Sequence, residues 1–184
     1  MEATFHLCSI KEKSAFFHAE SLMNKVGPSL TALFPQFFAA LGDTQSIRVL
    51  KQLLNHSNVA VRVEAINNIV KFRREELLSL IRTLSTHLEL PQQEACAFAL
   101  GQFKDEISLS ILKTLSSSKA ANVKLAALYA LYLLDKKESQ YPIIKAASEG
   151  NSFAIALLGH IPETENALYL LTLNENLNTR LNAT

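Results

Sequence analysis

The fold is decided by the stretch Val61-Arg62-Val63-Glu64-Ala65, followed by Ile69, because versions of it return along the chain. The later copies open at Gln92, Val123, Gly150 and Thr179. In the numbering of the chain, the steps between copies are therefore 31, 31, 27 and 29, and each copy has a small residue at its fifth position. Self-similarity at a period of this length is typical of stacked helical repeats.

Each repeat carries two helical patterns separated by a short polar corner. Ile47, Leu50, Leu53 and Leu54 recur at helical spacing in the first, and Asn58 is a plausible N-cap of the helix that follows. Strand-like alternation of apolar and polar residues persists nowhere in the sequence. We therefore predict an all-α protein, an α-solenoid of about five stacked helix pairs with a helical N-terminal cap.

The repeats divide the chain into a cap at residues 1–42 and an array at residues 43–184. The approximate repeats are 43–73, 74–104, 105–136, 137–162 and a truncated 163–184. The last copy stops before its expected apolar residue, and a natural array closes with a polar capping helix. We therefore expect further repeats after Thr184.

The N-terminal region holds six of the ten phenylalanines. Gly27-Pro28 separates two predicted helices, at about 12–25 and 29–41, and Pro35 should kink the second or delay its start. The aromatic side chains could cover the open end of the helical stack. Alternatively, they could form a surface that binds a partner.

Composition excludes several classes of protein. Apolar residues make up 48% of the chain, and the net charge of +1 argues against a dedicated nucleic-acid binder, although Lys71, Arg73 and Arg74 form a short basic cluster. Two cysteines are too few for a disulfide framework. The sequence has no apolar run long enough to span a membrane and no signal-like N-terminus. We expect a cytoplasmic protein that does not enter membranes.

With its repeats aligned, the chain resembles the HEAT-repeat family, specifically the short HEAT-like repeats of about 30 residues first described in phycobilisome lyases. The family pattern opens its second helix with Val-Arg, places a small residue three positions later and continues with Ala-Leu-Gly. Val61-Arg62 with Ala65 and Val123-Lys124 with Ala127 follow this pattern, whereas Gln92-Gln93 loses the Val-Arg pair.

The resemblance covers about residues 43–184 and implies roles for the repeated positions. The residues at the Arg position are Arg62, Lys124 and Arg180, and the resemblance implies that they pair with carbonyls or acids between repeats. It implies that the small residues let neighbouring second helices approach closely. It leaves function open, because adaptors, lyases and other enzymes share this scaffold.

No residue pattern points to catalysis. His56 and His87 occupy the same place in consecutive repeats and could stack on adjacent helices, but a metal site needs three or four ligands and the next repeat has Ser118 there. The resemblance gives a further argument against a metal-dependent enzyme. Hydroxylases of this family carry His-Glu dipeptides, and this chain has none. We therefore expect no metal, no cofactor and no enzymatic activity.

A binding face is suggested by helical geometry. If Ala65 and Ile69 face the core, rotation by about 100° per residue turns Asn67 outward. In the family the second helices line the concave side of the superhelix, which makes this face the predicted site. The partner-binding residues that we predict on it are Asn67, Phe98, Leu125, Tyr129 and Tyr132. The alternative is that these side chains only pack against neighbouring helices.

The predicted function is a non-enzymatic protein-interaction scaffold that holds a protein or peptide segment on this concave face. The alternative is a lyase-like or chaperone-like protein that binds a hydrophobic small molecule or a partner subunit in the same groove. Nucleic acid is not an expected partner. Whether the chain forms a homo-oligomer is left open by the sequence.

Overall fold

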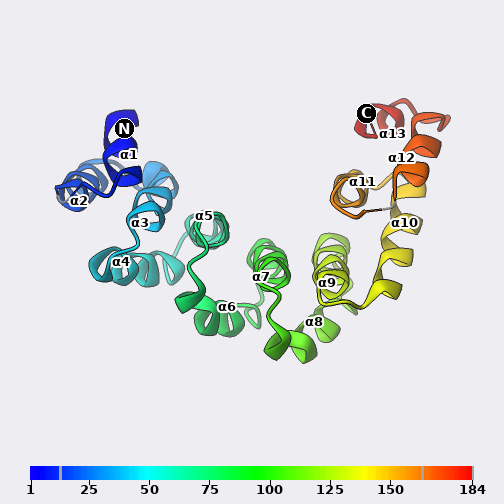
Figure 1. Cartoon of the computed structure of the whole chain (residues 1–184), viewed down its shortest axis with the longest axis horizontal. Coiled ribbons are helices and arrows are strands. Elements are labelled where there is room, and N and C mark those ends of the chain that lie inside the picture. The colour runs from blue at the N-terminus through cyan, green and yellow to red at the C-terminus, as the bar shows by residue number, and fades with distance from the viewer. Residues whose placement is uncertain (13, 163, 184) are drawn as a thin grey trace. The chain divides into compact units, whose positions relative to one another are not determined.

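The computed structural model describes residues 1–12, 14–162 and 164–183, and every regular element in this part of the chain is helical. The chain forms two compact units, residues 1–99 and 100–184. Helix α7 (Leu90–Gln102) carries the chain from one unit into the next (Figure 1). Consecutive helices pack as neighbouring pairs, which is the architecture predicted for an α-solenoid.

The first unit is built around α3, which packs on α1, α4 and α5. Its elements before α7 are α1 (Glu2–Ser9), α2 (Ala15–Lys25), η1 (Pro28–Leu33), α3 (Pro35–Leu41), α4 (Thr44–Leu54), α5 (Val59–Lys71), η2 (Glu75–Leu77) and α6 (Leu78–Leu84). The η elements are short 3₁₀ helices. The sequence pattern did not predict α1, and Pro35 delays the second predicted helix so that α3 begins there.

Phenylalanine side chains form the core of the first three helices. Phe34, Phe37 and Phe38 are fully buried, and the Phe34 and Phe37 rings lie 5.4 Å apart between centroids. Phe16 is buried against Phe38, with 5.9 Å between centroids. By contrast, Phe17 is 64% exposed. Most of the aromatic surface of this region is therefore used for internal packing.

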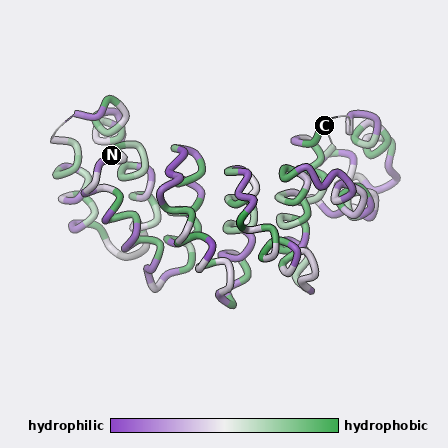
Figure 2. Tube along the Cα trace, turned by 60° about the horizontal axis from the view of Figure 1, so that its bottom comes forward, coloured by the Kyte–Doolittle hydropathy of each residue, from purple (hydrophilic) through white to green (hydrophobic). Residues whose placement is uncertain are grey.

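The second unit continues the series of helix pairs. Its elements after α7 are η3 (Glu106–Ser108), α8 (Leu109–Leu115), α9 (Ala121–Leu133), η4 (Lys137–Ser139), α10 (Gln140–Ser148), α11 (Ser152–Leu158), α12 (Glu165–Thr172) and α13 (Leu177–Asn182). The pairs are α8 with α9, α10 with α11 and α12 with α13, and α10 also packs on α9. Most helices carry both hydrophobic and hydrophilic residues along their length (Figure 2).

The second helices of the pairs begin at a constant step of 31 through four repeats. Their first residues are Val59, Leu90, Ala121 and Ser152. Helices α5, α7 and α9 each span 13 residues, whereas α11 spans only 7. The step of 27 predicted at the fourth copy is therefore wrong. The irregularity comes later, because α11 is short and α13 begins at Leu177, sooner than the same step would place it.

This correction changes which residue of the fourth repeat matches the earlier small positions. The side chain of Asn151 accepts a hydrogen bond from the Ala154 amide and starts α11, as Asn58 does for α5 by accepting from Ala60. Counted from these caps, Leu158 stands at the place of Ala127. Ala154, which was predicted for that place, is nevertheless buried.

A left-handed residue ends each of four second helices at the same step of 31. These residues are Gly42, Arg73, Lys104 and Asp135, with φ between 52° and 64°. After three of them the next backbone amide returns to the helix, as the Arg74 amide does by donating to the Ile69 carbonyl at 2.9 Å. The same backbone turn therefore connects successive helix pairs. Helix α3 ends with a residue of positive φ, as the later second helices do.

Two second helices pack closely at Gly101. A Cβ atom at this position would lie 2.6 Å from the Cα of Ala130, so α7 and α9 come together only because this residue has no side chain. Helix α9 is itself surrounded, since all residues from Leu125 to Tyr132 are buried. Its interior position explains why its sequence is almost wholly apolar.

Candidate functional site

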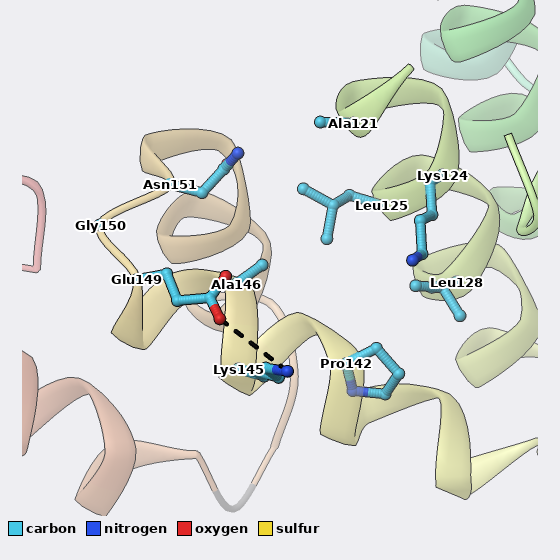
Figure 3. A pocket seen from close by; sticks show the side chains of 10 residues that line it. All are labelled: Ala121, Lys124, Leu125, Leu128, Pro142, Lys145, Ala146, Glu149, Gly150 and Asn151. Atoms are coloured by element: carbon cyan, nitrogen blue, oxygen red, sulfur yellow. Dashed lines mark ion pairs between the residues drawn. The ribbon is translucent and has the colours of Figure 1, made fainter. Parts of the chain in front are cut away.

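A groove of about 520 Å³ lies within the second unit, between α9 and α10. Both walls are formed by residues at positions i, i+3, i+4 and i+7 of one helix, and the turn between α10 and α11 closes one end (Figure 3). The lining residues are Ala121, Lys124, Leu125, Leu128, Pro142, Lys145, Ala146, Glu149, Gly150 and Asn151. This volume is within the range of binding pockets for small molecules or a few side chains.

The groove is open because a small residue replaces leucine in the wall formed by α10. Leu53, Leu84 and Leu115 stand at successive steps of 31 and are buried in their repeats. The next residue in this series is Ala146, which is half-buried and lines the groove. The shorter side chain at this position leaves space between α9 and α10.

The turn at the closed end is held by backbone hydrogen bonds. Gly150 adopts a φ of +87°, and the Asn151 amide donates to the Ala146 carbonyl at 3.0 Å. This left-handed turn ends α10, a place where glycine has no steric penalty. The groove therefore has a fixed end as well as two helical walls.

Charged side chains stand on the rim above an apolar interior. Leu125 and Leu128 are buried beneath the opening, whereas Lys124 and Lys145 are exposed. Lys145 lies 4.0 Å from the carboxylate of Glu149, the residue that directly follows α10. The Lys124 ammonium group makes no hydrogen bond or ion pair with the described residues. Such a groove can accept apolar side chains and attract an opposite charge beside them.

The equivalent corner of the first unit is closed by an arginine. Arg62 is 8% exposed, and its guanidinium donates to the carbonyls of His56 at 2.6 Å and Ser57 at 3.1 Å. It also donates to the buried side-chain oxygen of Gln92 and pairs with Glu89 at 3.1 Å. These are contacts of the kind that the resemblance implied for this position, and they tie α5 to the start of α7.

The other two predicted members of this set differ from each other. Arg180 donates to the carbonyls of Asn174 at 2.8 Å and Glu175 at 3.0 Å, the same relative positions that Arg62 uses. The Lys124 side chain makes no such contact with the described residues and lines the groove instead, so its structural role stays a prediction. Sequence reasoning missed Gln93, which donates to the His87 carbonyl at 2.7 Å and takes the place of arginine.

The predicted partner-binding residues do not share one environment. Asn67 is exposed and Phe98 is half-buried, both in the first unit. Leu125, Tyr129 and Tyr132 are at most 7% exposed in the second unit. The expectation that these three are displayed on an open face is therefore wrong, because α9 is covered by its neighbours. Leu125 alone of the three lines the groove.

The two tyrosines of α9 take part in internal interactions. Burial raises the pKa of Tyr129, a hydrogen bond with Gln102 lowers it, and the nearby Tyr132 raises it. The ammonium group of Lys137 lies 4.4 Å from the centre of the Tyr132 ring. Both rings thus contribute to packing inside the second unit.

Asn67 lies in a second hollow, of about 440 Å³, in the first unit. Its α5 wall is polar and again follows the spacing i, i+3, i+4 and i+7, with Glu64, Asn68 and Lys71 beside Asn67. The opposite wall comes from η1 and the start of α3. The Asn68 amide is occupied by the Glu64 carbonyl at 2.9 Å. This hollow lacks the apolar floor of the groove between α9 and α10.

The basic cluster of the sequence is partly used for capping. The guanidinium of Arg74 donates to the carbonyls of Ala39 at 2.7 Å and Ala40 at 3.1 Å. It sits so close to Gly42 that a Cβ atom there would collide with its central carbon. Arg74 therefore closes the end of α3, a role that its sequence position did not reveal.

His56 and the two buried cysteines contribute to local structure. His56 accepts a hydrogen bond from the Asn58 amide through Nδ1 at 3.0 Å. Burial raises the pKa of the Cys96 thiol to about 12, and burial together with the Asp43 charge raises the pKa of Cys8 to about 11. Within the described residues, no group of three histidine, cysteine or acidic side chains could hold a metal ion.

Ala146, Pro142 and Lys145 are groove residues that sequence reasoning missed. A signal for Ala146 was present, because it breaks the series of leucines at a step of 31. Pro142 and Lys145 carry no repeated signal. Their role is visible only when α10 is placed against α9 (Figure 3).

Comparison with known proteins gives a family for the central repeats. Residues 46–132 match the family model described as HEAT repeats, and this segment includes the groove residues of α9. No curated protein shows significant similarity to the chain. None of the described helices is long and apolar enough to cross a membrane. The constant step of 31, the paired helices and this match together place the segment 46–132 in the HEAT-repeat family.

Proposed function

We propose that this chain is a non-enzymatic interaction module that holds a segment of a partner protein in the groove between α9 and α10. HEAT repeats commonly serve as scaffolds for protein interactions, which makes binding the first function to consider. The observation that carries the proposal is the pair of helical walls with an apolar floor, opened by Ala146 where the other repeats have leucine. Parallel ridges of this kind are suited to apolar anchor residues.

The proposal moves the predicted site while keeping the predicted class of function. Leu125 keeps its proposed place in the interface as part of the floor. Tyr129 and Tyr132 are proposed to support α9 from within. Asn67 and Phe98 have no part in this groove, because they belong to the other unit.

The proposal is tested by selecting short random peptides on the whole chain and on a groove-filled variant. In Ala146→Phe the ring should occupy the space between the walls. The matched control is Ala156→Phe, which places the same ring on an exposed position of α11 outside the groove. Peptides enriched on the wild type should bind the control and lose binding to Ala146→Phe. Equal binding to all three proteins, or no enrichment at all, would show that the groove has no such function.

A further inference from the structure

Both walls of the groove between α9 and α10 carry positive charge. Lys124 projects from α9 and Lys145 from α10, and both side chains are exposed (Figure 3). Glu149 is the acidic member of the lining and lies 4.0 Å from Lys145. The rim thus has two cations and one anion. Lys124 has no ion pair among the described residues, so its charge is available to a ligand.

The residues around the groove increase the excess of positive charge at its rim. The stretch 107–149 contains six lysines and three acids, a formal charge of +3 in a chain whose total is +1. Lys113 and Lys119 lie at the same ends of the helices as Lys124, in the last turn of α8 and in the corner before α9. Asp135 and Glu138 lie in the turn at the other ends of α9 and α10. Of the three acids, Glu149 is thus the one beside the opening of the groove, where lysines outnumber it.

The start of α9 adds to this potential. Asn58 and Asn151 cap α5 and α11 with side-chain oxygens, whereas Ala120 at the same place before α9 offers none. The first amides of α9 therefore keep the partial positive charge of a helix N-terminus. Ala121, the first residue of α9, lines the groove.

The floor indicates which class of acidic ligand fits. Leu125, Leu128 and Pro142 are aliphatic, and the described lining contains no aromatic ring on which a nucleic-acid base could stack. Aliphatic floors accept aliphatic or aromatic side chains of a protein segment. We infer that the groove selects a partner segment in which aspartate or glutamate residues flank two apolar side chains. This inference rests on the proposed function and specifies its ligand.

The test uses one labelled peptide from the selection described above and measures its dissociation constant. The double variant Lys124→Glu with Lys145→Glu should weaken binding by about tenfold or more, because each reversal replaces attraction by repulsion at the rim. Lys136→Glu makes the same change in the turn at the other end of α9, outside the groove, and should change the affinity by less than about twofold. A peptide whose acids are replaced by lysine should bind the double variant better than the wild type.

The outcomes separate this inference from the proposed function. If Ala146→Phe abolishes binding while the double lysine variant binds normally, the groove is correct and the preference for acids is wrong. If Ala146→Phe binds the peptide as well as the wild type does, the groove itself is wrong. If a random-sequence RNA oligonucleotide displaces the peptide at a lower concentration than the unlabelled peptide does, the acidic ligand is nucleic acid and the inference is overturned.

Discussion

The corner at Arg62 and the corner at Lys124 occupy the same place in their repeats, yet one is closed and the other is open. Arg62 reaches the side chains of Gln92 and Glu89 and two backbone carbonyls. The residues that stand opposite Lys124 at the same positions are Ala154 and Asn151, in place of Gln92 and Glu89. Ala154 has no side-chain acceptor, and the Asn151 oxygen is used to cap α11.

This difference explains how one repeat position can be structural at Arg62 and, in the proposed function, take part in recognition at Lys124. A guanidinium holds several acceptors at once in a fixed plane, whereas a lysine ammonium on a flexible stem does not. When the acceptors disappear from the next helix, the cation turns to solvent. When the leucine of the first helix also becomes Ala146, the corner becomes a groove with a charged rim.

Removing the cation should give the largest contrast between the two corners. Arg62→Ala should lower the free energy of unfolding by about 3 kcal/mol, because it leaves Gln92 and two carbonyls of the corner without their donor. Lys124→Ala should change it by less than about 0.5 kcal/mol, as for other exposed residues. Both values follow from urea denaturation. Similar losses in the two variants would mean that the corners do not differ in the way described.

The tight contact between α7 and α9 provides a second contrast, at the face of α9 that packs on α7. Gly101→Ala should lower the free energy of unfolding by about 2 kcal/mol, because the new methyl group meets the backbone of Ala130. Gly159→Ala is the matched control, since its nearest contact would be 3.4 Å away. It should be neutral or slightly stabilising. A Gly101→Ala protein as stable as this control would show that α7 and α9 separate without cost.

Filling the groove should make the open corner resemble the closed one. Ala146→Leu restores the leucine of the earlier repeats and should raise the free energy of unfolding by up to about 1 kcal/mol through added apolar burial. The measurement is again urea denaturation, with Ala156→Leu on the exposed face of α11 as the control. A destabilised Ala146→Leu protein would indicate that the space is already filled or that α10 resists closer packing.

Substitutions in the turns between helix pairs should have equal effects on stability, because these turns share one backbone conformation. Lys104→Gly and Asp135→Gly each place glycine at a left-handed residue, with φ of 52° and 61°. Each change should raise the free energy of unfolding by about 0.5–1 kcal/mol, since a side chain is strained in this conformation. Thermal unfolding of the two single variants would check this. If one variant were stabilised and the other destabilised, the two turns would not share one strained conformation.

The fold was predictable to the extent that apolar spacing repeats. The step of 31 placed the helix pairs from α4 to α9 correctly, because α5, α7 and α9 are equally long. The step failed after Ser152, where α11 is much shorter and similar small residues, such as Ala154, recur out of register. Helix α1 was missed because its apolar residues show no clear helical spacing.

The candidate site was less predictable than the fold. Helical rotation identified the outward face of α5 correctly at Asn67, which is exposed. It failed for Tyr129 and Tyr132, because rotation about one helix does not reveal which other helices cover it. The groove depends on Ala146 facing Leu125 and Leu128, and this pairing arises from the packing of α10 on α9.

The most direct test of the groove is an NMR titration of the isotopically labelled chain with the selected peptide. The backbone amide signals of residues 121–128 and 143–151 should shift, and those of the closed corner at residues 56–64 should stay in place. Shifts at both corners, or at the closed corner alone, would contradict the claim that the loss of acceptors around Lys124 and of leucine at Ala146 created the binding site.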